Sequence, residues 1–276
     1  MDSPRRPVCA AAAAHPLEDL ARRLLAELAP HFGPDKPPRL LVRTLSGQPA
    51  TGQAAVNLEL PDGRLVLELR PEALAGLPPL ALEGWLDLEL WLGMLKTHPE
   101  MHPFNFSRAI LPRFNVSGGA AAYLRSIVEY LKNALLVWQA TGRLVDLGRS
   151  QAQVSHHFTQ LGHPGPDPAA YHNLLAHGWQ RSFFLLRKLG VLLAVSQLDR
   201  RGISQDFRSH FWEHHAYLTD PDRELLERLG ELPAELAGRK FEQLLVAMFE
   251  ELKQQLLAPR RGEAGRPDAT PPRPLG

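Results

Sequence analysis

Alternating apolar and polar residues define the first structured part of the chain. Leucine or valine stands at every second position from 56 to 60 and from 65 to 69, and Pro-Asp-Gly at 61–63 separates the two runs. A period of two is typical of half-buried strands, and a three-residue loop that ends in glycine suits a hairpin. A further strand is predicted at 39–45, so this part of the chain should form a small sheet.

Segments with the 3.6-residue period of helices make up most of the remainder. They lie at 16–29, 71–77 (a short turn), 80–96, 120–141 (ending near Gly142) and 144–161, and then at 168–178, 179–198, 203–217, 220–229 and 238–257. Glycine and proline dominate residues 162–166, which form the best internal boundary.

These patterns predict an α+β protein that is predominantly helical. We expect a small N-terminal β-sheet or hairpin packed on a buried central helix within residues 16–161, followed by an all-helical region at 167–257. Residues 1–15 and the tail at 258–276, which is rich in proline, glycine and arginine, are expected to be disordered.

The helix predicted at 80–96 is apolar on almost every side, which is typical of a helix inside a protein. Its carboxylates fall on two stripes, because Glu83 and Asp87 are four residues apart whereas Glu89 lies on the other side. A lone carboxylate among apolar groups is costly unless it is paired or protonated. Glu89 is therefore the most interesting acid, and the simpler alternative is that it reaches the protein rim or an arginine.

The order of strand, hairpin, short turn and buried helix resembles the zincin-type metallopeptidases, in particular the gluzincin-like group, over roughly residues 39–150. In that family the helix carries His-Glu-x-x-His, and the matching residues 88–92 read Leu-Glu-Leu-Trp-Leu. The resemblance implies a zincin-like α+β core at 16–161. It also implies that Glu129 occupies the position of the third zinc ligand, with Asn133 where a further acid often follows.

The motif lacks both of its histidines. Leu88 and Leu92 replace them, and leucine offers no donor atom to zinc. Without a metal there is no activated water for Glu89 to deprotonate. The resemblance thus implies a catalytically inactive protein in which Glu89 and Glu129 are vestigial site residues and no metal is expected. Alternatively, Lys132 places Glu129 on a solvated, salt-bridged helix face.

A second zinc pattern lies near the C-terminus. Residues 210–214 have the spacing His-x-x-Glu-His of another peptidase group, so His210, Glu213 and His214 are candidate ligands if zinc is bound. The alternative is a polar helix face with Phe211 and Trp212 as core anchors, which the total of 12 histidines favours because chance pairs are then common.

The remaining groups of histidines contain no carboxylate residue between their members. They are His156-His157 with His163, and His172 with His177. We expect these side chains at the surface or at helix caps.

Composition excludes several classes of protein. The 31 Lys+Arg residues nearly balance 30 Asp+Glu, which gives no electrostatic case for nucleic acid, and the basic C-terminal helices that include Arg181 interleave with aromatics more typical of a core. The single cysteine excludes a disulfide framework and cysteine-based zinc clusters. No apolar stretch reaches the ~18 residues of a membrane span, so a cytoplasmic protein is expected.

Three functions remain open at this point. The first is a non-catalytic zincin-like scaffold or protein-binding module. The second is a metal-dependent hydrolase with a non-standard site, which would draw on the carboxylates above and on His98 or His102. The third is a helical interaction module unrelated to peptidases. The first and third require a protein partner or self-association.

Overall fold

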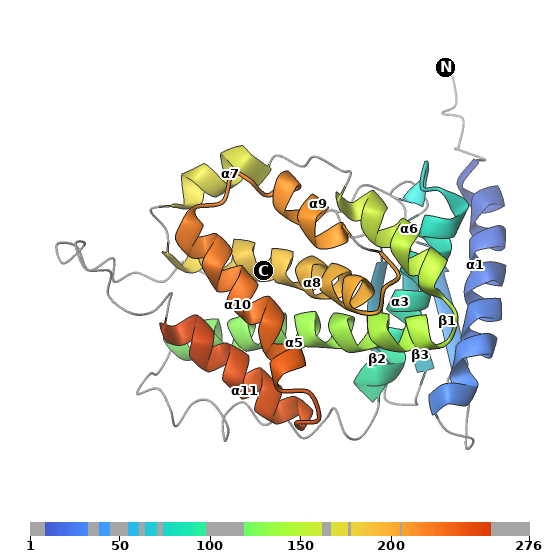
Figure 1. Ribbon diagram of the computed structural model, residues 1–276. Helices are drawn as coiled ribbons and strands as arrows, with labels where there is room; N and C mark the ends of the chain where they lie inside the picture. The colour runs from blue at the N-terminus through green and yellow to red at the C-terminus, as the bar shows by residue number, and fades with distance from the viewer. Residues whose placement is uncertain are drawn as a thin grey trace. The chain divides into compact units, whose positions relative to one another are not determined.

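The computed structural model describes most of the chain, and its fold is α+β and predominantly helical, as predicted (Figure 1). The described ranges are 9–32, 39–44, 55–60, 64–70, 74–97, 119–161, 167–175, 178–204 and 206–254. Among the helices of these ranges, none is both long and apolar enough to span a bilayer.

The chain divides into two compact units, each built from separate stretches of sequence. The first unit comprises Met1–His102, Gln139–His163 and Arg201–Ser204, and the second comprises Pro103–Trp138, Pro164–Arg200 and Gln205–Gly276. The sequence predicts two contiguous regions, whereas these units interleave and the division falls within a single helix, α5 (Gly119–Asp146).

The first unit contains a three-stranded sheet with the strand order β1-β3-β2. Its strands are β1 (Arg39–Thr44), β2 (Ala55–Leu60) and β3 (Arg64–Leu69). The central strand β3 runs antiparallel to β2, which confirms the predicted hairpin, and parallel to β1. Consecutive residues 65, 66 and 67 of β3 are all buried, so both faces of this strand are covered.

Helices pack directly on this sheet. α1 (Cys9–Leu28) contacts β1 and is followed by a 3-10 turn, η1 (Ala29–Phe32), whereas α3 (Pro79–Thr97) contacts β2 and β3. The predicted packing of a sheet on a buried central helix is therefore confirmed. α1 begins at Cys9 rather than at Pro16, because residues 10–14 are all alanine, the residue type with the highest helix propensity.

A close contact between two helices organises the first unit. α6 (Ser150–Leu161) lies against α3, and buried Gly84 marks the point where their backbones meet. A Cβ atom on Gly84 would stand 2.1 Å from the carbonyl oxygen of Ala152 and 3.0 Å from the Cβ of His156. Gln153 Nε2 donates a hydrogen bond of 2.9 Å to the carbonyl oxygen of Gly84, which fixes the contact.

The predicted end of the long helix near Gly142 is wrong. α5 continues through the buried Gly142 and ends at Asp146, where Gly148 adopts a φ of +81°. A glycine inside a helix costs only about 1 kcal/mol, whereas a left-handed residue just beyond the helix is a frequent stop signal. This stop places Arg149 directly ahead of α6.

In its described residues from 167 onward, the second unit consists of helices joined by turns and short loops, as predicted. Its elements are α7 (Asp167–Leu174), α8 (Gly178–Arg200), α9 (Phe207–His214), α10 (Asp220–Glu235) and α11 (Phe241–Leu252), together with most of α5. α8 contacts α7, α9 and α10, and α10 contacts α11. α8 is accordingly the central helix, with leucines 185, 186, 189, 192, 193 and 198 buried.

A buried ion pair joins three of these helices. Arg181 Nε donates to Asp222 Oδ2 at 2.5 Å, Arg181 Nη2 contacts the other carboxylate oxygen, and the two side chains are 3% and 1% exposed. Tyr171 Oη donates to the same Oδ2 at 2.6 Å and accepts the backbone N–H of Thr219 at 3.0 Å. Arg181 is thus a structural residue of the core, and not part of a basic surface.

We expect Gly84→Ala to lower the free energy of unfolding by about 1–3 kcal/mol or more, because the new methyl group would overlap the backbone of α6. Urea denaturation followed by circular dichroism measures the change. Gly190→Ala is the matched control, since a Cβ there meets only Ala134 Cα at 3.9 Å, and it should be neutral or stabilising by up to about 1 kcal/mol. Equal effects of the two substitutions would contradict the close contact.

Arg181→Met should destabilise the protein by about 3–5 kcal/mol, because it leaves the Asp222 carboxylate buried without its cation. Replacing both partners, as Arg181→Met with Asp222→Leu, should recover most of that loss, since no buried charge then remains. The double-mutant cycle is measured by chemical denaturation. A single variant within about 1 kcal/mol of the wild type would show that the pair is not buried.

Candidate functional site

The residues that match the peptidase motif lie inside the first unit. Leu88 and Leu92 on α3 are only 5% and 9% exposed, and Leu90 and Trp91 between them are also buried. Glu89 is half-buried. The two positions that carry zinc ligands in zincins therefore present packed hydrocarbon side chains, which have no donor atoms.

Glu129 belongs to the second unit and lies on an exposed face of α5. Its side chain is 54% exposed, and Lys132 Nζ lies 3.7 Å from its carboxylate. Asn133 is exposed as well. These contacts match the alternative interpretation of Glu129 as part of a solvated, salt-bridged face.

The second zinc pattern lies on α9, with its polar residues outside and its aromatic residues inside. His210 Nδ1 is 3.1 Å from Glu213 Oε2, and both side chains are exposed, as is His214. Phe211 and Trp212 are buried, which confirms their prediction as core anchors. In the part of the chain that the structure describes, no three His, Cys, Asp or Glu side chains are grouped so that they could hold a metal ion.

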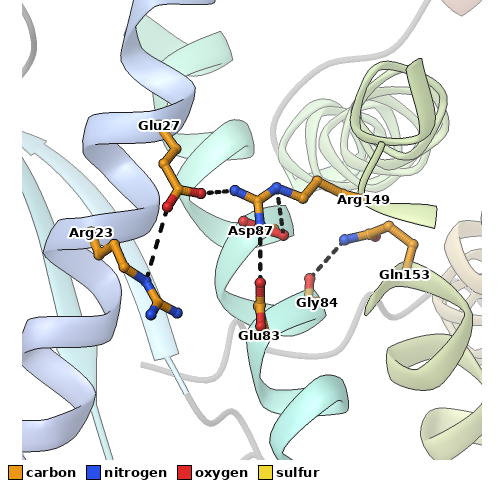
Figure 2. A network of polar contacts seen from close by, with 7 residues as sticks. All are labelled: Arg23, Glu27, Glu83, Gly84, Asp87, Arg149 and Gln153. Carbon is orange, nitrogen blue, oxygen red and sulfur yellow. Dashed lines mark hydrogen bonds and ion pairs between the residues drawn. The ribbon is translucent and has the colours of Figure 1, made fainter. Parts of the chain in front are cut away.

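Polar groups gather instead where α1, α3 and α6 meet (Figure 2). Arg149 Nη1 donates to Glu83 Oε1 at 2.9 Å, its Nη2 contacts Glu27, and its Nε lies 3.9 Å from Asp87 Oδ2. Glu27 also lies 4.0 Å from the guanidinium of Arg23. We call these five residues, Arg23, Glu27, Glu83, Asp87 and Arg149, the Arg149 cluster.

Asp87 is the least solvated member of the Arg149 cluster. Its side chain is 0% exposed, and neither carboxylate oxygen has a hydrogen-bond partner. Burial and, to a smaller extent, the nearby charge of Glu83 raise the pKa of Asp87 from 3.8 to about 7, against the lowering influence of Arg23. Perturbed acids of this kind are frequent at functional sites, although structural ion-pair networks produce them too.

His156 and His157 are buried, so their expected position at the surface is wrong. The contacts of α6 with α3 run through residues 149, 152, 153 and 156, which share one helical face, and this face encloses His156. Burial lowers the pKa of His157 to about 4 and that of His156 well below 6.5, so both rings are neutral at pH 7.

The other histidines of these groups differ in position. His172 is exposed as expected, with its Nδ1 2.6 Å from the carbonyl oxygen of Pro168. His163 and His177, like His98 and His102, lie outside the described residues.

The sequence singles out Glu89 among the acids of α3, whereas the structure singles out Asp87. The helix is apolar on all sides, so its pattern does not show which stripe faces α6 and which faces the sheet. The i,i+4 spacing of Glu83 and Asp87 and the breaker at Gly148 were available signals, but the arginine that serves both acids is distant in sequence. Only tertiary packing identifies Arg149 as their shared partner.

The geometry of the Arg149 cluster limits its chemistry. An acid that titrates near neutral pH is suited to proton transfer, but a catalytic acid needs contact with a substrate. Asp87 is fully enclosed, whereas Glu27 and Glu83, which reach solvent, are held by Arg149. The cluster is therefore suited to controlling helix packing through charge.

We expect Arg149→Met to destabilise the protein by about 2 kcal/mol, less than a fully buried pair because Glu27 and Glu83 keep access to water. Arg201→Met is the control, since it removes a surface pair with Asp146 and should cost at most about 1 kcal/mol. Thermal and urea unfolding measure both variants. A smaller loss for Arg149→Met than for Arg201→Met would contradict the role given to the cluster.

Comparison with known proteins adds no family to this description. No protein-family model matches the chain, and neither a curated protein nor a solved structure matches it. The zincin resemblance thus depends on the residues and the order of elements already given.

Proposed function

We propose that the chain is a non-catalytic protein with a zincin-like frame, which serves as a scaffold or protein-binding module. The observation that carries the proposal is the burial of Leu88 and Leu92 on either side of Glu89. A carboxylate in the position of a peptidase base has no metal-bound water to act on when its two neighbours on the helix are core leucines.

The packing of α3 supports the frame. The resemblance requires strands that precede and adjoin the helix, and α3 contacts both β2 and β3. Each buried leucine contributes about 1.5–3 kcal/mol of hydrophobic stabilisation. Replacing histidine by leucine at positions 88 and 92 thus favours core packing at the place where a zincin keeps a polar, solvent-accessible cleft.

Surface properties support a protein partner over other ligands. The formal net charge of +1 provides no attraction to nucleic acid, and the single cysteine is consistent with the reducing cytoplasm. Phe158 on α6 is 57% exposed, and Leu80 and Ile203 in the same unit are also exposed. Exposed aromatic side chains are frequent anchors in protein interfaces.

Restoring the missing donors tests the zincin frame. The variant Leu88→His with Leu92→His recreates His-Glu-x-x-His around Glu89, and we expect it to bind one zinc per chain whereas the wild type binds substoichiometric zinc. The control is Leu86→His with Leu90→His, which has the same spacing and also occupies buried positions on α3. Metal analysis after gel filtration and zinc titration followed by calorimetry measure binding.

Two results would contradict the proposal. Equal zinc affinity in both double variants would show that any histidine pair on α3 binds the metal, so positions 88 and 92 are not special. A stoichiometric zinc in the wild-type protein, with loss of stability on chelation, would favour a metal-dependent hydrolase. Circular dichroism of each variant establishes that it is folded before the comparison is made.

A further inference from the structure

We propose that the junction of α1, α3 and α6 is a proton-operated switch, in which uptake of one proton by the Asp87 carboxyl tightens α6 on α3. This inference is independent of the proposed function, because it concerns the stripe of α3 that faces α6 rather than the peptidase-like residues. It is based on the burial of Asp87, on the number of charges around it and on the contact at Gly84.

Arg149 is shared among three acids. Its two terminal nitrogens are committed to Glu83 and Glu27, and only Nε points to Asp87, at 3.9 Å (Figure 2). That distance is too long for a hydrogen bond, so the charge of an ionised Asp87 is poorly compensated. A fully enclosed carboxylate without a hydrogen bond is strongly disfavoured relative to its neutral form.

The charges of the Arg149 cluster do not balance. The Arg149 cluster places three carboxylates, Glu27, Glu83 and Asp87, against two guanidinium groups. One negative charge is therefore in excess when all three acids are ionised, and one proton removes the excess. Asp87 takes this proton because Glu27 and Glu83 are partly exposed and directly bonded to Arg149.

Other titratable groups on the packed elements do not supply the missing charge. On α6, His156 and His157 are buried and neutral at pH 7 because burial lowers their pKa values. On β3, Glu68 is half-buried and carries no positive charge. From α1, Arg23 lowers the pKa of Asp87, but its effect is smaller than those of burial and of Glu83.

The burial of Asp87 is linked to the position of α6. Gly84 lies one turn before Asp87, and there the backbones of α3 and α6 are in direct contact. If α6 moves away from α3, the Gly84 contact therefore breaks and Asp87 becomes exposed to water at the same time. Such a contact has a packed and an opened state, and protonation of Asp87 shifts the equilibrium between them.

The direction of the pH effect follows from linkage. The pKa of Asp87 is about 7 in the packed state and 3.8 when the group is solvated. The stabilisation of the packed state by the proton on Asp87 is fully present below pH 3.8, and it is lost as the pH rises through 7. Between these values the opening equilibrium of α6 increases up to tenfold per pH unit, and above pH 7 it levels off.

The buried histidines act in the opposite direction. The pKa of His157 is about 4 in the packed state and 6.5 when solvated, so its contribution is present above pH 6.5 and is lost as the pH falls towards 4. Because the two effects overlap, the wild-type profile alone is not diagnostic. A variant that removes only the Asp87 titration is needed.

Hydrogen exchange of the full chain between about pH 5.5 and about pH 8.5 tests the switch, with rates corrected for the intrinsic effect of pH. We expect ionisation of Asp87 to raise the opening constant of α6 amides by more than about tenfold between pH 5.5 and pH 8.5, measured as the ratio of the wild type to Asp87→Asn, in which the histidine effects cancel. Asp87→Asn should remove this increase and keep α6 protected at high pH. Asp146→Asn, which alters an exposed carboxylate, should retain the wild-type profile.

A second variant keeps the test decisive if Asp87→Asn does not fold. Glu83→Gln leaves Asp87 in place but removes one negative charge, so the positive and negative charges of the Arg149 cluster become equal. Because the charge of Glu83 raises the pKa of Asp87, the pH at which the opening constant levels off should fall below that of the wild type. The proposal is overturned if Asp87→Asn opens with the same pH dependence as the wild type. It is also overturned if Glu83→Gln leaves that pH unchanged.

Discussion

The contact of Gly84 with α6 is the constraint on which the first unit depends. Because no side chain separates the two backbones, Gln153 reaches the Gly84 carbonyl and Arg149 is held over the acids of α1 and α3 (Figure 2). The same approach removes Asp87 from water. One missing side chain thus produces both the tight packing of α3 and α6 and the unusual acid beside it.

The two units contain buried acids with different surroundings. In the second unit, Asp222 receives a pair of contacts from Arg181 and a hydrogen bond from Tyr171, so its charge is matched and every oxygen is used. In the first unit, Arg149 contacts Glu27 and Glu83 more closely than it contacts Asp87, and Asp87 accepts no hydrogen bond. A matched charge stabilises a single packing arrangement, whereas an unmatched one makes the packing sensitive to protons.

Sequence periodicity predicted the elements but not the chemistry between them. The hairpin, the buried helix and the helical C-terminal region follow from residues such as Leu65, Leu67 and Leu86, whose spacing depends only on local geometry. The burial of His156 and the isolation of Asp87 depend on which face of α6 meets α3, and no local pattern encodes that choice. Gly142 and Gly148 illustrate the same limit, because only the second adopts a left-handed conformation.

α3 has two different sides, one with the leucines at 88 and 92 and the other with the acid at 87. The peptidase-like side is core, and the side facing α6 holds the titratable group. The most direct test of this account is a carbon-13 NMR titration of the Asp87 carboxyl in selectively labelled full-length protein. The account predicts a midpoint near pH 7, the value set by burial and by the charge of Glu83. A midpoint near the ordinary value of 3.8 would contradict it.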